Sequence, residues 1–461
     1  MASRSGFSSR FGFIAAAAGS AVGLGNIWKF PYETAQNGGG AFLLLYLVFV
    51  VAIGFPVMAT EIAIGRNTQS NPFGAYLKAG NRSWANVGLL GVLCGVMILS
   101  FYNVVAGWAF GYFVEISFGN LLAEEDYGAF FGRYVADFWD NMVFSMVFMT
   151  LTAVIVFRGI QKGIELASKI MMPMLFLVLF LLIGYALTLP NAAEGIRYYL
   201  LPDFSKINLT AINSALGQSF FSLSLGMGAL ITYGSYIGKK ENITSAAFIV
   251  TAADTSVAFL AGLLMLPLVF SQGTPPEASG PGLVFTILPG IFADFGPMAG
   301  RVVGGLFFLL LSLAALTSTI SLLEVAVSYF TDEKKWSRGK AVSILASAIF
   351  ILGLPSMLSF GGVDWLSNLS YGGQSHSFLD LVSDLFSDIG LPLGGMLMCI
   401  FVARKWGFSN MTNEIASGNE TYRGSWVEKF IRVMITYICP IFLAAIFISN
   451  ILEKFFNVNL F

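Results

Sequence analysis

Long apolar stretches, separated by short polar ones, run along almost the whole chain. About eleven of them are long enough to cross a bilayer as helices, since one crossing takes about 20 predominantly apolar residues. The pattern predicts an all-α integral membrane protein that forms one continuous unit over residues 1–461. The predicted spans are approximately 11–33, 40–65, 86–118, 139–157, 167–189, 210–236, 245–271, 297–329, 338–357, 377–403 and 430–452.

Composition agrees with this pattern. Of the 461 residues, 56% are hydrophobic and 11% are charged, whereas soluble domains carry about 25% charged residues. Cys94, Cys399 and Cys439 all fall in apolar segments without metal-site spacing, and the chain has one histidine. No structural metal or haem is therefore expected. A net charge of −1 gives no reason to expect a nucleic-acid partner, and the sequence has no Walker loop for ATP.

The distribution of charge predicts the orientation. Most of the 25 Lys and Arg fall on one side if the N-terminus is cytoplasmic, while the opposite loops carry acids such as Glu124, Glu125 and Asp126. Basic residues stay on the cytoplasmic side of membrane proteins. We therefore expect a multi-pass protein of the plasma (inner) membrane, with a cytoplasmic N-terminus and an extracytoplasmic C-terminus.

Two of the spans are interrupted by glycine-rich segments, at 19–26 and 222–228. Inside a membrane, such a break persists only against protein or a water-filled site, because every backbone group needs a partner. The freed N–H groups can hold a carboxylate and the freed carbonyls can hold a cation. Two breaks about two hundred residues apart predict two structural repeats around one central site, a pattern typical of secondary transporters.

Three acids lie deep within predicted spans: Glu61, Asp254 and Glu324. A charge inside a membrane is costly, so each needs a partner. Asp254 has no basic residue near it in sequence, and a bound cation would be a suitable partner. The alternative is a protonated or hydrogen-bonded structural aspartate.

The eighth span carries a second oxygen-rich group. Ala314, Thr317 and Ser318 stand at i, i+3 and i+4 and so share one helix face. Neutral oxygen ligands match Na⁺ better than Ca²⁺ or Mg²⁺, which favour carboxylates. Alternatively, the hydroxyls bond back to carbonyls of their own helix.

Charged residues near the outer ends suggest gates. Lys29 follows the first break, and Asp380, Asp384 and Asp388 recur at helical spacing near the outer end of the tenth span. We expect Asp384, or its competitor Asp380, to pair with Lys29 above the site; the alternative is a lysine that only extends to the interface. An inner gate between Arg4 and Asp332 is signalled more weakly. His376 is interpreted as an interfacial residue.

Four segments resemble the neurotransmitter:sodium symporter family, and in particular its bacterial amino-acid branch. They read AGSAVGLGNIWKFP at 18–31, NGGGAF at 37–42, SFFSLSLGMGA at 219–229 and LTSTI at 316–320. The likeness covers essentially the whole chain. It implies two inverted five-helix repeats, at 11–189 and 210–403, with the first and sixth helices unwound at mid-membrane and an eleventh helix, 430–452, outside the repeats.

The resemblance also implies the site residues. One sodium ion is expected at Ala21, Asn26, Ser222 and Asp254, and a second at Gly19, Val22, Ala314, Thr317 and Ser318. Phe221 and Tyr102 would cover the substrate, and Phe7 would close the cytoplasmic side. The substrate would be bound by Ala21, Gly23, Gly25, Ile98, Tyr102, Phe221, Ser222, Ser224, Met227, Gly228, Thr319 and Leu322.

Three residues depart from the family pattern. Lys29 stands where Arg is frequent, and Lys lacks the forked geometry of a guanidinium. Phe7 replaces the usual Trp and cannot donate an N–H bond. Asp254 replaces Asn, and its fixed negative charge would offset the sodium ions, so we expect no chloride requirement.

The apolar pocket residues argue against charged side chains, because an unpaired buried charge is costly. We therefore expect sodium-coupled symport of hydrophobic L-amino acids, from branched-chain to aromatic, into the cell by alternating access, and no enzymatic activity. The alternatives are a channel or sensor, and a proton-coupled symporter in which Asp254 or Glu61 carries the proton. The sequence predicts a lipid bilayer and an amino acid as partners and leaves the oligomeric state open.

Overall fold

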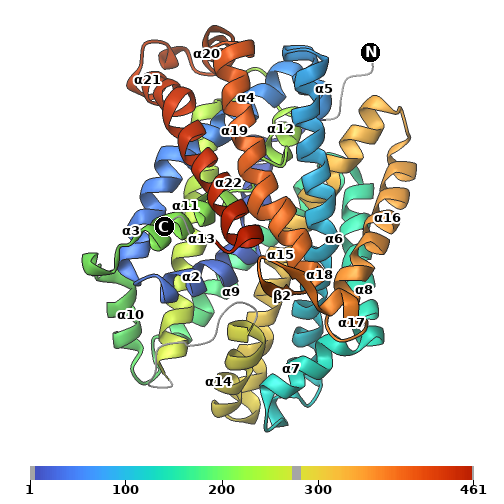
Figure 1. Cartoon of the computed structure of the whole chain (residues 1–461), viewed down its shortest axis with the longest axis vertical. Coiled ribbons are helices and arrows are strands. Elements are labelled where there is room, and N and C mark those ends of the chain that lie inside the picture. The colour runs from blue at the N-terminus through green and yellow to red at the C-terminus, as the bar shows by residue number, and fades with distance from the viewer. Residues whose placement is uncertain (1–5, 272–281, 459–461) are drawn as a thin grey trace.

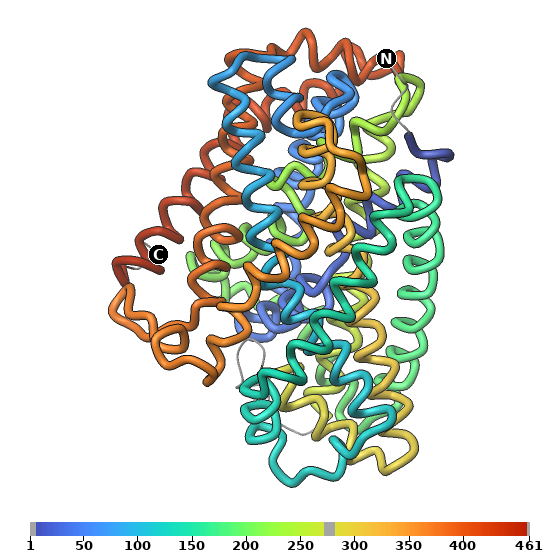
Figure 2. The backbone as a smooth tube through the Cα atoms, turned by 90° about the vertical axis from the view of Figure 1, so that its right-hand side faces the viewer, coloured from blue at the N-terminus to red at the C-terminus, as the bar shows by residue number. Residues whose placement is uncertain are grey.

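The computed structural model describes residues 6–271 and 282–458. Helices run mostly along the long axis of the molecule and account for nearly all of the ordered secondary structure (Figures 1 and 2). The all-α prediction is thus confirmed, apart from one short hairpin. Its strands β1 (Leu369–Tyr371) and β2 (Gln374–His376) pair antiparallel, with Leu369 opposite His376.

Nine helices within the described residues are long and apolar enough to cross a membrane. A tenth span is a bent pair, Arg10–Ala21 and Gly25–Gln36, whose halves meet at 54°. The predicted span at 210–236 is divided into α11 (Leu209–Ser222) and α12 (Ala229–Gly234), each too short to cross alone. Ten of the eleven predicted spans and both breaks are therefore found in the described residues, while the sixth span consists of two short helices.

Several spans combine α-helical and π-helical segments. The elements that form the spans are α1 (Arg10–Ala21), η1 (Gly25–Lys29), α2 (Phe30–Gln36), α3 (Gly40–Phe49), η2 (Val50–Gly54), α4 (Phe55–Thr68), α6 (Arg82–Phe118), α8 (Phe138–Phe157), η4 (Ile160–Glu165), α9 (Leu166–Ala186), α13 (Ile243–Phe270), α15 (Pro297–Glu333), α16 (Arg338–Leu358), α18 (Phe378–Ser383), η7 (Asp384–Gly390), α19 (Leu391–Phe401), η8 (Val402–Trp406), α21 (Trp426–Val433), η10 (Met434–Ile438) and α22 (Cys439–Phe456).

Shorter elements connect the spans, and the sequence analysis did not anticipate them. They are α5 (Pro72–Ala79), η3 (Leu121–Ala123), α7 (Tyr127–Ala136), α10 (Ala192–Leu200), η5 (Phe204–Lys206), η6 (Leu283–Ile287), α14 (Leu288–Asp294), α17 (Asp364–Ser367), α20 (Phe408–Ala416) and η9 (Glu420–Tyr422). Polar side chains cap the starts of long helices: Asn81 accepts from the Trp84 N–H at α6, and Asn242 accepts from the Ser245 N–H at α13. Such caps satisfy N–H groups that have no partner within the helix.

The longest helices, α6 and α15, pack against each other in the centre of the molecule (Figure 1). In the most apolar 18-residue segments of α6 and α15, 72% and 78% of the residues are buried, whereas in the corresponding segment of the last span only 28% are buried. The two long helices thus form the core, and α22 lies at the edge. The segments of the two breaks pack near this core.

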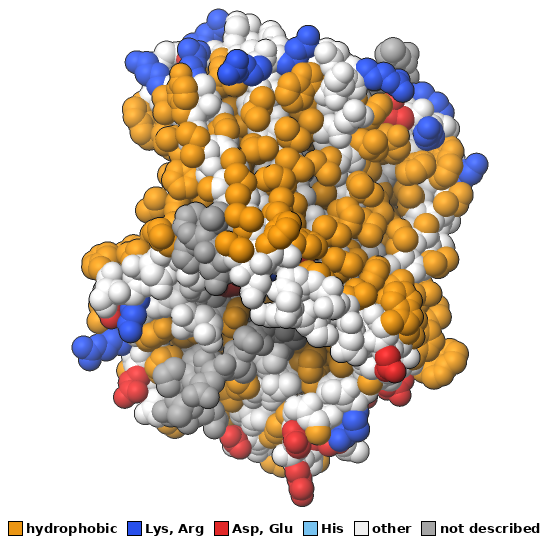
Figure 3. All heavy atoms as spheres, in the orientation of Figure 1, with side chains coloured by type: hydrophobic (Ala, Val, Ile, Leu, Met, Phe, Trp, Pro, Cys, Tyr) orange, Lys and Arg blue, Asp and Glu red, His pale blue; other side chains and the backbone are white. Residues whose placement is uncertain are grey.

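The surface carries a broad apolar belt between two polar ends (Figure 3). Large apolar side chains such as Val48, Leu177 and Ile441 are at least 60% exposed. Most of the Lys and Arg visible in this view gather at the end that carries α5, α20 and α21, while Asp and Glu are more frequent at the opposite end, near α7 and α14. Such a belt suits contact with lipid.

Candidate functional site

Both broken spans lose their helical conformation at their glycine-rich segments. Helix α1 ends at Ala21, and Val22 is extended, with φ −66° and ψ 117°. In the second break, Gly226 and Gly228 have φ of 82° and 77°, a region that glycine enters without steric cost. Ser224 also has a positive φ of 53°. The glycine-rich composition therefore accounts for the unwinding.

Hydrogen bonds join the two breaks directly. The Ser224 hydroxyl donates to the Ser20 carbonyl over 2.8 Å, and Gln218 Nε2 donates to the Gly25 carbonyl over 2.8 Å. All four groups are buried. The predicted meeting of the two breaks at one centre is therefore what the structure shows.

A cluster of polar side chains from three spans lies beside the breaks. Asn26 Nδ2 donates to Asp254 Oδ1 over 2.7 Å and to Ser222 Oγ over 2.9 Å. The Ser222 hydroxyl donates to Asp254 Oδ2 over 2.8 Å. Asp254 is fully buried in α13. Three of the four residues predicted for the first sodium site are thus in contact, and the fourth, Ala21, lines the adjoining cavity together with Ser222.

The chemistry of this cluster fits a monovalent cation. Within the described residues, the hydrogen bonds to the Asp254 carboxylate come from neutral groups, the Asn26 amide and the hydroxyls of Ser222 and Tyr46. A buried carboxylate with neutral partners keeps its negative charge uncompensated, which is unfavourable unless a cation or a proton joins it. Hard oxygen donors of this kind suit sodium.

A second group of oxygens lies between α1 and α15. The Ser318 and Thr317 hydroxyls lie 3.2 Å and 3.3 Å from the Val22 carbonyl, and Thr317 Oγ1 also lies 2.9 Å from the Ala314 carbonyl. At Gly19, an added Cβ would lie 3.3 Å from Thr317, so the two backbones are close. The five residues predicted for the second sodium site thus lie close together, and both hydroxyls reach the Val22 carbonyl at the end of α1 instead of bonding only within α15.

A small cavity lies between these two oxygen groups. Its volume is about 30 Å³, roughly the room for one water molecule. An added Cβ at Gly23 would lie 2.6 Å from Ser318 Oγ and 2.8 Å from the Tyr102 hydroxyl, so only glycine fits. The cavity is lined by Ala21, Gly23, Gly25, Ile98, Tyr102, Phe221, Ser222, Ser224, Met227, Ser318, Ser321 and Leu322.

A wider vestibule of about 350 Å³ lies next to this cavity on the side of η7. Gly25, Tyr102 and Phe221 line both spaces and so lie between them. The Leu24 N–H donates to the Tyr102 hydroxyl over 3.0 Å, which fixes the tyrosine against the first break. Movement of Phe221 would join the two spaces.

Two residues of the predicted substrate set do not line this cavity. The Thr319 hydroxyl lies 2.8 Å from the Thr152 hydroxyl of α8 and 3.0 Å from the Leu316 carbonyl. Gly228 lies instead beside Glu61, in a separate space of about 10 Å³. Ser321, which the sequence analysis did not select, takes a place in the lining.

The predicted outer pair between Lys29 and Asp384 is not formed in this structure. Lys29 Nζ lies 5.0 Å from the centre of the Phe221 ring, and the ion pair to Asp384 comes from Lys454 of α22, at 3.0 Å. Asp380, the predicted competitor of Asp384, forms a capping box with Ser377 at the start of α18. A Ser three residues before an Asp is a signal for such a cap.

On the opposite side, Arg4 lies outside the described residues. The Phe7 ring packs edge-on against Tyr233 and Tyr236, and the Phe7 N–H donates to the Tyr236 carbonyl over 3.2 Å. Asp332 accepts from the Asn71 N–H over 3.0 Å. Phe7 thus packs against the segment that follows the second break.

Known proteins resemble this chain in sequence and in structure. The model of the sodium:neurotransmitter symporter family matches residues 4–129 and 137–458. The uncharacterized sodium-dependent transporter YhdH of Bacillus subtilis (strain 168) is 38% identical over 454 residues, which cover 96% of this chain and 97% of YhdH. The crystal structure of MhsT in complex with L-phenylalanine superposes with a TM-score of 0.88 at 42% identity, covering 97% of this chain and 100% of MhsT.

The chain belongs to the sodium:neurotransmitter symporter family. It is accordingly a sodium-dependent, multi-pass membrane transporter and not an enzyme. More distant members include the sodium-dependent serotonin transporter of Drosophila melanogaster, 29% identical over 490 residues, which cover 95% of this chain and 75% of that protein.

Two further buried acids of this symporter, Glu61 and Glu324, contact groups of other spans. Glu61 Oε1 accepts from the Gly226 N–H over 2.8 Å, so it binds the second break. Glu324 forms an ion pair with Arg338 over 2.5 Å and accepts from the Tyr236 hydroxyl over 2.6 Å. Gly226 and Tyr236 are distant in sequence from the acids they contact, whereas Arg338 begins the helix that follows α15.

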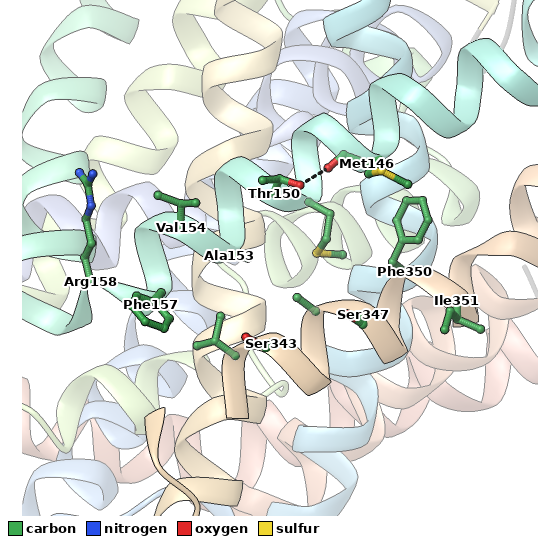
Figure 4. Close-up of a pocket in the computed structure, with 13 residues that line it drawn as sticks. Met146, Thr150, Ala153, Val154, Phe157, Arg158, Ser343, Ser347, Phe350 and Ile351 are labelled. Atoms are coloured by element: carbon green, nitrogen blue, oxygen red, sulfur yellow. Dashed lines mark hydrogen bonds between the residues drawn. The ribbon is translucent and has the colours of Figure 1, made fainter. Parts of the chain in front are cut away.

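The symporter has another cavity, of about 590 Å³, between α8 and α16 (Figure 4). Met146, Val154 and Ile351 of its lining are 46–61% exposed. It shares no lining residue with the central cavity. A choice of binding site by cavity volume alone would therefore select this hollow in the apolar outer surface and not the central cavity between the two breaks.

Proposed function

We propose that this protein carries hydrophobic L-amino acids into the cell together with sodium, by alternating access. The observation that carries this proposal is the arrangement of two oxygen clusters on either side of one small, largely apolar cavity at the paired breaks. Each cluster has the ligand chemistry of sodium. The cavity between them is where the second transported species would bind.

Two sodium sites follow from the clusters. The first is made by Asn26, Ser222 and Asp254 with the Ala21 carbonyl. The second is made by the carbonyls of Gly19, Val22 and Ala314 with the hydroxyls of Thr317 and Ser318. The contacts of Ser318 and Thr317 with Val22 support the second set, because these atoms already converge.

An L-amino acid suits the space between them. Its carboxylate would approach the N–H groups at the start of η1, where helix polarity favours a negative charge. Ile98, Met227 and Leu322 would surround its side chain, and none of them can neutralise a charge. The bound L-phenylalanine of the related MhsT structure supports an apolar side chain. A methionine lining adapts to ligands of different size, from branched-chain to aromatic.

We infer that chloride is not required. Asp254 provides a buried negative charge beside the first sodium site, where the resemblance implies that many members of the family have Asn. A fixed carboxylate can balance cation charge without a bound anion. Transport measured with gluconate in place of chloride would test this inference, and uptake that disappears without chloride would contradict it.

Alternating access would use the two sides of the bundle in turn. We propose two inverted repeats, 11–189 and 210–403, with α1 and α11–α12 as equivalent broken spans, and a cytoplasmic N-terminus at the basic end of an inner membrane protein. Phe221 and Tyr102 would cover the substrate. Lys29 and Asp384 would close the outer side, and Arg4, Phe7 and Asp332 the inner side.

The test is uptake of radiolabelled leucine into proteoliposomes with sodium, potassium or a proton gradient outside. Accumulation only with sodium, competed by unlabelled phenylalanine and valine but not by lysine or glutamate, is the expected result. Accumulation driven by protons alone would contradict sodium coupling and indicate that Asp254 or Glu61 carries a proton; Glu61 Oε2 is buried and has no hydrogen-bond partner among the described residues. Uptake competed only by glycine or alanine would contradict the broad apolar selectivity.

A further inference from the structure

Lys454 lies in the last helical turns of the chain and binds two acids of another span. Its Nζ is 3.0 Å from Asp384 Oδ1 and 3.8 Å from Asp388 Oδ2. The two acids are four residues apart in η7 and present their carboxylates on the same side. One lysine at the edge of the molecule therefore balances the negative charge of both acids.

The surroundings of Lys454 hold this end of α22 in place. Asn450 Nδ2 donates to the Asp388 carbonyl over 2.6 Å, and the Phe455 ring stacks on Tyr371 with centroids 5.2 Å apart. The Tyr371 hydroxyl donates to Asp384 Oδ2 over 2.8 Å. Burial and the Asp384 carboxylate raise the pKa of Tyr371 well above its ordinary value, so the hydroxyl keeps its proton and remains a donor.

Lys29 faces the same vestibule but is not at the acids. Its ammonium lies over the Phe221 ring, at 5.0 Å from the centroid. Lys29, Lys454, Asp384 and Asp388 all line the vestibule of about 350 Å³. Two cations of the same chemistry thus line one vestibule together with one pair of carboxylates.

We propose that Lys454 is a second cation of the outer gate, which holds Asp384 and Asp388 toward α22 while the vestibule is open. Closure exchanges the cation: the acids leave Lys454 and approach Lys29, above the Phe221 ring. This inference rests on the alternating-access function proposed above. Lys454 is a positioning residue, because it acts through the acids and does not line the central cavity.

Such an exchange requires that the acids form ion pairs of similar strength with Lys454 and with Lys29. Lys454 is 34% exposed, and water in the vestibule weakens its attraction to the acids. Pairs that are partly solvated shift equilibria by about two- to fivefold. Loss of Lys454 would therefore favour the closed gate by about this factor without preventing opening.

The experiment measures access to the vestibule. A cysteine placed at Leu379, which lines the vestibule, is labelled with a membrane-impermeant maleimide in proteoliposomes that contain sodium and no substrate. The native Cys94, Cys399 and Cys439 are buried, and the chain without the added cysteine gives the background. We expect Lys454→Gln to lower the labelling rate about two- to fivefold.

Three variants separate competition from a merely structural effect. Lys454→Arg should restore the labelling rate, because it retains the charge. Lys206→Gln removes an exposed lysine of η5, which does not line the vestibule, and should leave the rate unchanged. In a Lys29→Gln background the effect of Lys454→Gln should vanish, since no second cation remains to receive the acids.

An unchanged labelling rate in Lys454→Gln would overturn the proposal, and so would an equal decrease in the Lys29→Gln background. If Lys454→Gln does not fold, Tyr371→Phe provides the same test, because it weakens the hold on Asp384 and should also lower labelling. The assay uses no substrate, so its outcome is separate from that of the uptake assay. Absent leucine uptake with the expected labelling pattern would contradict the proposed substrate and leave the gate inference standing.

Discussion

The carboxyl group of Glu61 in α4 accepts a hydrogen bond of 2.8 Å from the backbone N–H of Gly226, in the middle of the second break. A residue of one span thus satisfies a backbone group that another span has released by unwinding. Inside a membrane such a group has no water to replace the lost partner. The break is therefore stabilised from outside its own helix.

This contact predicts different effects for two substitutions of Glu61. Glu61→Ala leaves the Gly226 N–H without an acceptor and should lower the free energy of unfolding by about 1–3 kcal/mol. Glu61→Gln keeps a carbonyl oxygen in place and should cost much less. Thermal unfolding in detergent with sodium measures both, and equal losses would show that the hydrogen bond is not what stabilises the break.

Asp254→Asn should weaken sodium binding. The substitution keeps the size of the side chain but removes the charge, and hydrogen bonds or ligand contacts with a charged group contribute about 1.5–3 kcal/mol. We expect the sodium concentration for half-maximal uptake to rise by about tenfold or more. Asp203→Asn, at an exposed acid that caps η5, is the control. A normal sodium titration with a lower unfolding temperature would favour the structural interpretation of Asp254.

Replacement of both hydroxyls of the second cluster, Thr317→Ala with Ser318→Ala, should also raise the half-saturating sodium concentration, by about tenfold or more. The control is Ser328→Ala on the same helix, whose hydroxyl donates to the Val325 carbonyl one turn earlier. A sodium titration of leucine uptake compares the two. If the double variant titrates like the control, the second site does not use these oxygens.

Thr319 should affect stability and not selectivity. Its hydroxyl joins α15 to Thr152 of α8, so Thr319→Val should lower the free energy of unfolding by about 1 kcal/mol while the order of competing amino acids stays the same. Leu322→Ala, in the cavity lining, should change that order. If Thr319→Val changes the order of competing amino acids, Thr319 does take part in the substrate pocket.

Glu414 of α20 predicts a pH dependence at the basic end. Burial raises the pKa of Glu414, whereas hydrogen bonds from Asn67, Lys239 and Arg66 lower it. Together the hydrogen bonds outweigh burial, so the pKa lies below its ordinary value. A carboxyl with a lowered folded pKa stabilises the fold above its unfolded value, near about 4.3, and loses this contribution as pH falls. The unfolding temperature of Glu414→Gln should lie below that of the unmodified protein at pH 7, and the difference should shrink on acidification below that value. A difference that is constant with pH would contradict the assignment.

The sequence predicted the parts of the site that depend on local composition. Glycines at 19–25 and 226–228 indicated the breaks, and the spacing of Ala314, Thr317 and Ser318 indicated a common face. The resemblance supplied the partners on other helices, such as Asn26 and Ser222 for Asp254.

What could not be predicted depends on packing between distant spans. Lys454 and Asp384 are joined only because α22 packs against η7, and neither residue has a local signal for the other. The resemblance assigned Thr319 to the pocket, whereas helical rotation turns its hydroxyl toward α8. The Asp380 cap is different, because the Ser377 signal was present in the sequence and was not used.

The close approach of Gly23 to Ser318 and Tyr102 leaves no room for a side chain at that point. On the proposed function, the common part of an amino acid would be recognised here by main-chain atoms and the Tyr102 hydroxyl, which substitutions at Ile98, Met227 or Leu322 do not alter. The machinery for ions and the preference for a particular side chain can accordingly diverge independently. The same fold can therefore acquire a new substrate during evolution through a few substitutions in the cavity lining, while the residues that couple transport to ions stay unchanged.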